Sequence, residues 1–293
     1  MANLDLRPLS LGEILDRTFS LHRNHFWLFT GIIAIPNLLV LAFQLVQTAV
    51  MAVPAIRPPA VPADEFQARA TSLSGVGISG FLVGGSIAII VYLIVYLFAQ
   101  GGTVFAVSEL YLGRTITIGE ALKRMRGQLG NLFGVTMLNG LVIMVATLFL
   151  IIPGIYMSCR LVTSVPAALL EDLGPRDSLT RSYSLTKDFA GRAFVIYLLY
   201  FFLLSAASML LTFPFSIALV MNMKHPETMR IWMALSHVGG FLAGVLVTPF
   251  FMIATCVFYY DLRVRKEAFD LQLMMNPSGQ ISPTEPGVAR SFS

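Results

Sequence analysis

Charged residues are scarce in this chain, and their scarcity decides the class of protein. Only 12% of the 293 residues are Asp, Glu, Lys or Arg, whereas a soluble domain carries about 25%. The composition therefore excludes an ordinary soluble fold. Five stretches contain no charged residue, and each exceeds the roughly 20 residues that cross a hydrocarbon core. They are 26–56, 70–108, 127–159, 193–223 and 231–260.

Signatures of catalysis and of cofactor or metal binding are also missing from the sequence. It contains no phosphate-binding G-x-x-x-x-G-K, no G-x-S-x-G nucleophile turn and no H-E-x-x-H pair. The four histidines do not converge with carboxylates or thiols at ligand spacing. We therefore assign no catalytic residue, no metal ligand and no cofactor, and expect a protein that is not an enzyme. Cys159 and Cys256 fall inside apolar stretches and are predicted to be buried structural thiols.

The charge-free stretches predict an all-α fold, an integral membrane six-helix bundle built from three helical hairpins. The region 127–170 is long enough for two spans, with a turn predicted at Pro153-Gly154. We expect one transmembrane domain over 1–275 and a disordered tail over 276–293, which is rich in Pro, Ser and Gly. The predicted spans are 26–52, 79–108, 131–152, 154–171, 193–221 and 231–260.

A short pattern recurs three times, each time before an apolar run. It begins at Ser10, Thr117 and Gly174, places an acid three residues later, and continues to a Leu and an Arg. The first two copies are capping boxes, which start a helix by satisfying two backbone donors. In the third, Pro175 at the first helical position has a similar effect. The spacing of apolar and basic residues is typical of amphipathic interfacial helices, although packing against the ends of the spans is the alternative.

The spans repeat together with this pattern. Each even-numbered span ends in an acid, namely Glu109, Glu171 and Asp261, and each odd-numbered span follows a surface helix. The repeating unit is therefore a surface helix, a span, an outer connection and a second span. Parallel repeats of this kind predict a pseudo-threefold arrangement about an axis near the membrane normal.

The distribution of Lys and Arg predicts the orientation of the chain. With six spans, the N-terminus, 109–130, 172–192 and the C-terminal segment share one side, and they hold 15 of the 20 basic residues. Short cytoplasmic segments carry the excess of Lys and Arg. We therefore expect a multi-pass protein of the inner (cytoplasmic) membrane with both termini in the cytoplasm.

Arg160 is the only charged residue well inside a predicted span. An intramembrane ionisable group is a candidate site for a ligand or anion. Two other interpretations remain open, because the side chain could reach outward to the interface or serve as a structural partner.

Eight further basic residues lie at the predicted cytoplasmic ends of the spans. They are candidate contacts for anionic membrane lipids, or for a membrane or envelope protein partner. A stop-transfer cluster with internal salt bridges is the alternative for those after the last span. No nucleic-acid partner is expected, because the basic residues do not cluster away from the membrane. The candidates are Arg17, Lys123, Arg124, Arg126, Arg181, Arg263, Arg265 and Lys266.

Prolines and glycines inside the spans allow a second interpretation. Pro36, Pro166, Pro214 and Pro249 interrupt four spans, and broken helices line substrate sites in transporters. The pairs Gly80/Gly84 and Gly240/Gly244 permit close helix packing. A polar cavity at mid-membrane would favour a small permease with a site between the hairpins, whereas a tightly packed apolar interior would remove that interpretation.

Several segments together resemble one bacterial family, the membrane domain found fused to glycerophosphoryl diester phosphodiesterases and also found as stand-alone multi-span proteins. The resemblance covers about residues 6–275. It implies a six-span, all-helical inner-membrane module without the phosphodiesterase barrel, and it offers no catalytic positions to transfer. The segments are 6–17 before Phe26-Trp27, 152–156 followed by Arg160, 165–171, 177–182 and 258–270.

These observations favour a non-catalytic membrane module that handles lipid or scaffolds envelope proteins. The small permease is the alternative. The sequence does not indicate a substrate or an oligomeric state.

Overall fold

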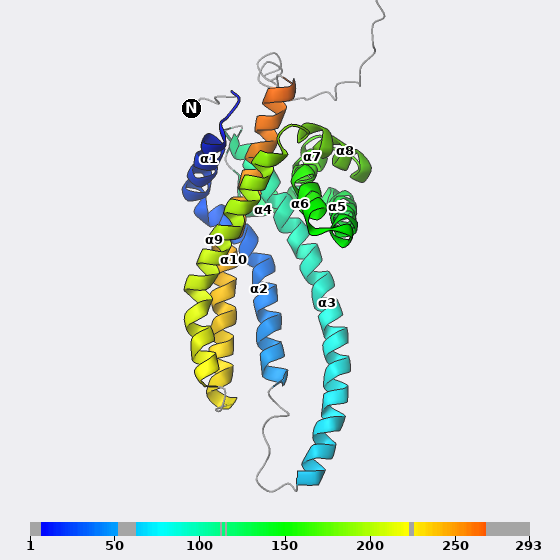
Figure 1. The fold of residues 1–293 in the computed structure, drawn as a ribbon, viewed down its shortest axis with the longest axis vertical. Coiled ribbons are helices and arrows are strands. Elements are labelled where there is room, and N and C mark those ends of the chain that lie inside the picture. The colour runs from blue at the N-terminus through cyan, green and yellow to red at the C-terminus, as the bar shows by residue number, and fades with distance from the viewer. Residues whose placement is uncertain (1–6, 52–62, 112, 115, 223–225, 268–293) are drawn as a thin grey trace, which may run out of the picture.

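The structure is a computed structural model, and it describes residues 7–51, 63–111, 113–114, 116–222 and 226–267. These residues form α-helices and one 3-10 turn, with no strand among them (Figure 1). The predicted tail over 276–293 lies outside the described residues. The helices are α1 (Leu11–Asn24), α2 (Phe26–Met51), α3 (Ala63–Tyr111), α4 (Ile118–Arg124), α5 (Leu129–Phe149), α6 (Ile151–Arg160), α7 (Ser164–Leu170), α8 (Pro175–Leu185), α9 (Ala190–Met221) and α10 (Pro226–Glu267).

Six helical segments within the described residues are long and apolar enough to cross a membrane. This confirms the predicted all-α class and the expectation of a multi-pass membrane protein. In four of them most residues of the apolar stretch stay outside the buried core, as helices solvated by lipid require, whereas more than half are buried in Ile151–Leu170 (56%) and Thr228–Glu267 (61%). The segments are Phe26–Ala49, Gly85–Tyr111, Leu129–Phe149, Ile151–Leu170, Ala190–Met221 and Thr228–Glu267.

The three predicted helix starts are confirmed. Glu13 N donates to Ser10 Oγ at 3.3 Å, and Ser10 N donates back to Glu13 Oε2 at 2.6 Å. Thr117 and Glu120 form the same reciprocal box before α4. At α8, Pro175 occupies the first helical position, where its missing N–H costs nothing because that group has no intrahelical partner.

The fourth span differs from the prediction. The break after α5 falls at Leu150, whose backbone is extended (φ −166°, ψ 148°), so Pro153 and Gly154 lie inside the first turns of α6. A second break at 161–163 separates α6 from α7 and places Pro166 in the first turn of α7. Proline is tolerated in a first turn, and neither residue therefore marks the turn or kink that we expected. Pro36, Pro214 and Pro249 lie within continuous helices.

The elements with most of the charged residues gather at one end of the molecule. Figure 1 shows α1, α4, α7, α8 and the C-terminal end of α10 at that end, whereas α2, α3, α9 and α10 run along the long axis. The buried core lies there too, around Phe258, Tyr259 and Leu262 of α10. In the same view α5 and α6 lie beside the upper half of α3. This arrangement determines where the candidate sites lie.

Candidate functional site

The acid at the end of each even-numbered span contacts the surface segment of the next repeat. Glu109, near the end of α3, forms an ion pair with Arg124 of α4 and a second with Arg114 at 3.6 Å. The Glu109 side chain is only 13% exposed. The arginine of the repeated pattern therefore anchors α4 to the span that precedes it.

Glu171 follows the same plan at the end of α7. Its two carboxylate oxygens accept from Arg181 Nε at 3.0 and 2.8 Å, and Tyr259 Oη donates to Oε1 at 2.6 Å. Arg181 also pairs with Glu267 at the end of α10. Burial alone would lower the pKa of Arg181, but the hydrogen bonds and charges of Glu171 and Glu267 hold it above its usual value. Arg181 of α8 therefore connects α7 to α10 through its two ion pairs.

Asp261 on α10 is the third of these acids. Its side chain is fully buried and accepts from the backbone N–H of Leu9 at 2.7 Å, just before α1. Arg265 Nε lies 2.9 Å and Arg192 Nη1 3.3 Å from the same carboxylate. The last acid thus holds the start of α1, as the other two hold α4 and α8.

Most of the predicted basic candidates are therefore engaged within the protein. Arg17 Nη1 donates to Tyr111 Oη at 2.8 Å, and Arg263 Nε pairs with Glu267 at 3.1 Å. Lys266 lies 3.7 Å from Asp188. The side chain of Arg126 lies outside the described part of the chain. Among the described residues Lys123 has neither a hydrogen-bond nor an ion-pair partner, which distinguishes it from the other candidates whose side chains are described.

Arg160 ends α6 and packs against α8. Its guanidinium lies 3.8 Å from the ring centre of Tyr183, and the residue is 3% exposed. Its carbonyl accepts from Ser182 Oγ at 2.9 Å and from Thr186 Oγ1 at 2.8 Å. In the described structure, Nε of Arg160 is buried with no hydrogen-bond partner. Arg160 thus contacts α8 through its carbonyl and its guanidinium, and the guanidinium also lies 5.8 Å from the ring centre of Tyr156 in α6.

Three glycines seat α4 and the 3-10 turn that follows it (Met125–Gly127) on the seam between α2 and α3. A Cβ at Gly31 would lie 2.8 Å from Ile118 Cδ1, and one at Gly102 would lie 3.1 Å from Leu122 Cδ2. At Gly101, a Cβ would overlap Met125, 2.1 Å from its sulfur. The absence of side chains lets α4 lie close to both helices.

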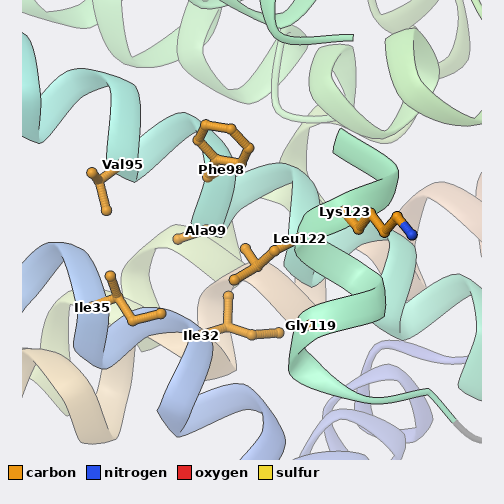
Figure 2. A pocket seen from close by; sticks show the side chains of 8 residues that line it. All are labelled: Ile32, Ile35, Val95, Phe98, Ala99, Gly119, Leu122 and Lys123. Carbon is orange, nitrogen blue, oxygen red and sulfur yellow. The ribbon is translucent and has the colours of Figure 1, made fainter. Parts of the chain in front are cut away.

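A groove opens where α4 meets this seam, and we call it the α4 groove. Its volume is about 540 Å³. Figure 2 shows apolar side chains of α2 and α3 on one side and Lys123 on the α4 side, its amine pointing away from Ile35 and Val95. The residues that line the groove are Ile32, Ile35, Val95, Phe98, Ala99, Gly119, Leu122 and Lys123.

A second apolar hollow continues along the same two helices. It holds about 250 Å³ and begins one turn beyond Ile35 and Val95, with Leu39, Val40 and Phe43 from α2 and Ile89, Val91 and Tyr92 from α3. The two hollows therefore form an apolar path along the seam. Lys123 lies at the end of this path where the charged elements gather.

A third cavity lies between α3, α5, α7, α9 and α10, and we call it the polar chamber. It holds about 240 Å³, and Leu161 and Val162 of the α6–α7 break line it. Asn139 Nδ2 donates to Ser164 Oγ at 3.0 Å within it. Oε1 of Gln100 and Oδ1 of Asn139 are buried with no hydrogen-bond partner among the described residues. Such orphaned acceptors are costly inside a membrane protein.

Sequence reasoning missed the residues that build the chamber and support its wall. The hydroxyls of Ser178, Ser182 and Thr186 form a buried stripe on α8 at spacing four, and Ser182 Oγ lies 2.9 Å from Thr163 Oγ1 at the break. The four-residue spacing of these hydroxyl side chains could have predicted that they share one helix face. Nothing in the sequence paired Gln100 with Asn139, because they are brought together only by the packing of α3 on α5.

Comparisons with known proteins found no match for this chain among family models, curated proteins or solved structures. The resemblance to the membrane domain fused to glycerophosphoryl diester phosphodiesterases stays a prediction.

Proposed function

We propose that this chain is a non-catalytic multi-pass protein of the cytoplasmic membrane that handles lipid by binding an anionic phospholipid in the α4 groove. Both termini would lie in the cytoplasm. The observation that carries the proposal is Lys123, a cation without an ion-pair partner among the described residues, above an apolar seam. The positive charge of Lys123 at one end of the groove complements the phosphate of a phospholipid headgroup, and the apolar walls along the rest of the groove match an acyl chain.

The dimensions of the seam support a lipid tail as the occupant. The lining residues Ile32 and Phe43 lie eleven residues apart on α2, or about 16 Å at 1.5 Å per residue. Half of a hydrocarbon core is about 15 Å. An acyl chain that follows the seam from the headgroup of an inner-leaflet lipid would thus reach the bilayer centre.

Replacing Lys123 by glutamine is expected to weaken binding of phosphatidylglycerol about fivefold, because one lysine near an anionic surface contributes about 1 kcal/mol. Binding of phosphatidylcholine should stay unchanged. Native mass spectrometry of the purified full chain, titrated with each lipid, measures both affinities.

Lys187→Gln is the matched control, since Lys187 is an exposed lysine after α8 and lies outside the groove lining. Ile35→Trp fills the groove and should weaken both lipids alike. Equal losses in the Lys123 and Lys187 variants would assign the effect to general surface charge and contradict the proposal.

The α5–α6 connection makes a separate prediction about topology. Leu148, Phe149 and Leu150 at its tip are 86%, 79% and 65% exposed, and Figure 1 shows α5 and α6 beside only the upper half of α3. We expect this tip to remain in hydrocarbon. A Leu150→Cys variant should therefore resist an impermeant maleimide applied from either face of membrane vesicles.

Ser184→Cys is the positive control, because Ser184 is exposed on α8 and should react from the cytoplasmic face. The native cysteines are buried and give the background. Rapid labelling of Cys at position 150 from the outer face would place the tip in water and refute this topology.

A further inference from the structure

We propose that the polar chamber is a binding site for a small, uncharged polyhydroxy solute such as a four-carbon polyol. This site is separate from the α4 groove, and its success or failure leaves the lipid proposal untouched. The chamber lies between helices of all three sequence repeats, whereas the groove lies on the α2–α3 seam.

The polar residues of the chamber lie at a depth where the membrane is hydrocarbon. Thr255 and Thr248 line it six and thirteen residues before Asp261 on α10, or about 9 and 20 Å along the helix. Both positions fall within a hydrocarbon core of about 30 Å. Polar groups at such depth are expensive and tend to mark substrate pathways.

The broken fourth span supports the same conclusion. The chain leaves helical geometry at 161–163, and Leu161 and Val162 line the chamber. Irregular backbone at membrane depth occurs where it is buried in protein or lines a polar cavity. Here α8 supports the break from behind, through the bonds of Ser182 and Thr186 to the Arg160 carbonyl.

The lining excludes a charged ligand. None of the described residues that line the chamber is Asp, Glu, Lys, Arg or His. An ion placed there would lose its hydration without gaining a counter-charge, which costs far more than burying a neutral polar group.

The hydrogen-bonding groups favour hydroxyls. Gln100 Oε1 and Asn139 Oδ1 need donors, whereas the hydroxyls of Tyr200 and Thr248 can both donate and accept. A ligand hydroxyl satisfies both kinds of partner. The rings of Tyr200 and Phe251, tilted by 31° with centres 4.7 Å apart, offer an apolar surface to the C–H face of a polyol.

The volume limits the size of the ligand. About 240 Å³ equals the space of about eight water molecules at roughly 30 Å³ each. A four-carbon polyol replaces several of these waters, whereas a disaccharide would not fit.

Saturation-transfer NMR on the full chain in nanodiscs tests the site, with erythritol as the probe and erythronate, its carboxylate analogue, as the charged comparator. We expect a saturable signal from erythritol and none from erythronate. In the Gln100→Leu/Asn139→Leu double variant, erythritol affinity should fall about 25-fold, since each amide removed weakens binding about fivefold.

Asn37→Leu is the matched control, because Asn37 is another intramembrane amide that donates to its own helix at Ile33 O and lies outside the chamber lining. If the double variant fails to fold, Thr248→Val, which removes one lining hydroxyl, takes its place with an expected loss of about fivefold. A chamber that holds water only would give no saturable erythritol signal, and this result would overturn the proposal. Equal signals from wild type and the chamber variants, or from erythritol and erythronate, would overturn it too.

Discussion

Replacing Asp261 by asparagine should lower the free energy of unfolding by about 3 kcal/mol, the largest effect that we expect of any single side chain. The carboxylate is fully buried and holds Leu9 N, Arg192 and Arg265 at once. Asparagine keeps the shape but removes the charge and turns one acceptor into a donor. Breaking a buried ion pair costs about 3–5 kcal/mol. The lower end applies because Arg192 and Arg265 keep 30% and 21% exposure.

Unfolding of the detergent-purified protein by heat or by titrated SDS measures this loss. Asp188→Asn provides the control, because Asp188 pairs with Lys266 at 3.7 Å while remaining 72% exposed. An exposed pair contributes about 0–1 kcal/mol. If both variants unfold alike, the bonds of Asp261 to the start of α1 do not stabilise the fold.

The helices could be predicted because their causes are local in the sequence. A charge-free run of sufficient length needs no tertiary contact to indicate a span. The pairs Ser10/Glu13 and Thr117/Glu120 cap their helices through bonds across three residues. The sequence also marked Glu109, Glu171 and Asp261 by their repeated position, although not their partners.

The sites could not be predicted because they depend on contacts between distant segments. Asp261 meets Leu9 from 252 positions away, and no spacing rule connects the two. Lys123 resembles Arg124 in the sequence. Only the packing of α4 shows that Arg124 is paired with Glu109, whereas Lys123 borders the α4 groove.

The small-residue spacing illustrates the same limit on α10. The sequence singled out Gly240 and Gly244, and Gly244 does pack closely, since a Cβ there would lie 3.1 Å from Asn37 Oδ1 of α2. The close glycine contact with α9, however, is at Gly239 and not at Gly240. A Cβ at Gly239 would lie 2.2 Å from the Leu211 carbonyl oxygen, whereas one at Gly240 would lie 3.9 Å from Thr212. A pattern of period four indicates a face, but the exact contact depends on helix rotation, which packing determines. The packing around Gly80 and Gly84 lies outside the described part of the chain.

Gly239→Ala should therefore destabilise the protein by about 1–3 kcal/mol, the cost of overpacking a close contact. The added methyl group meets the backbone of α9, at 2.2 Å from Leu211 O and 2.9 Å from Leu211 C. Backbone cannot rotate aside as a side chain can. The two helices must separate along their contact, and the same unfolding measurement would report the loss.

Gly240→Ala is the decisive comparison, because both substitutions remove one glycine from the same turn of α10 and restrict the unfolded chain equally. Its methyl group meets only Thr212 Cγ2 at an ordinary 3.9 Å, and alanine favours a helix over glycine by up to about 1 kcal/mol. We expect Gly240→Ala to be neutral or stabilising. The loss of backbone freedom is the same at both positions, so it cannot destabilise one variant and stabilise the other. Equal unfolding midpoints for the two variants would therefore mean that α9 and α10 do not touch at Gly239.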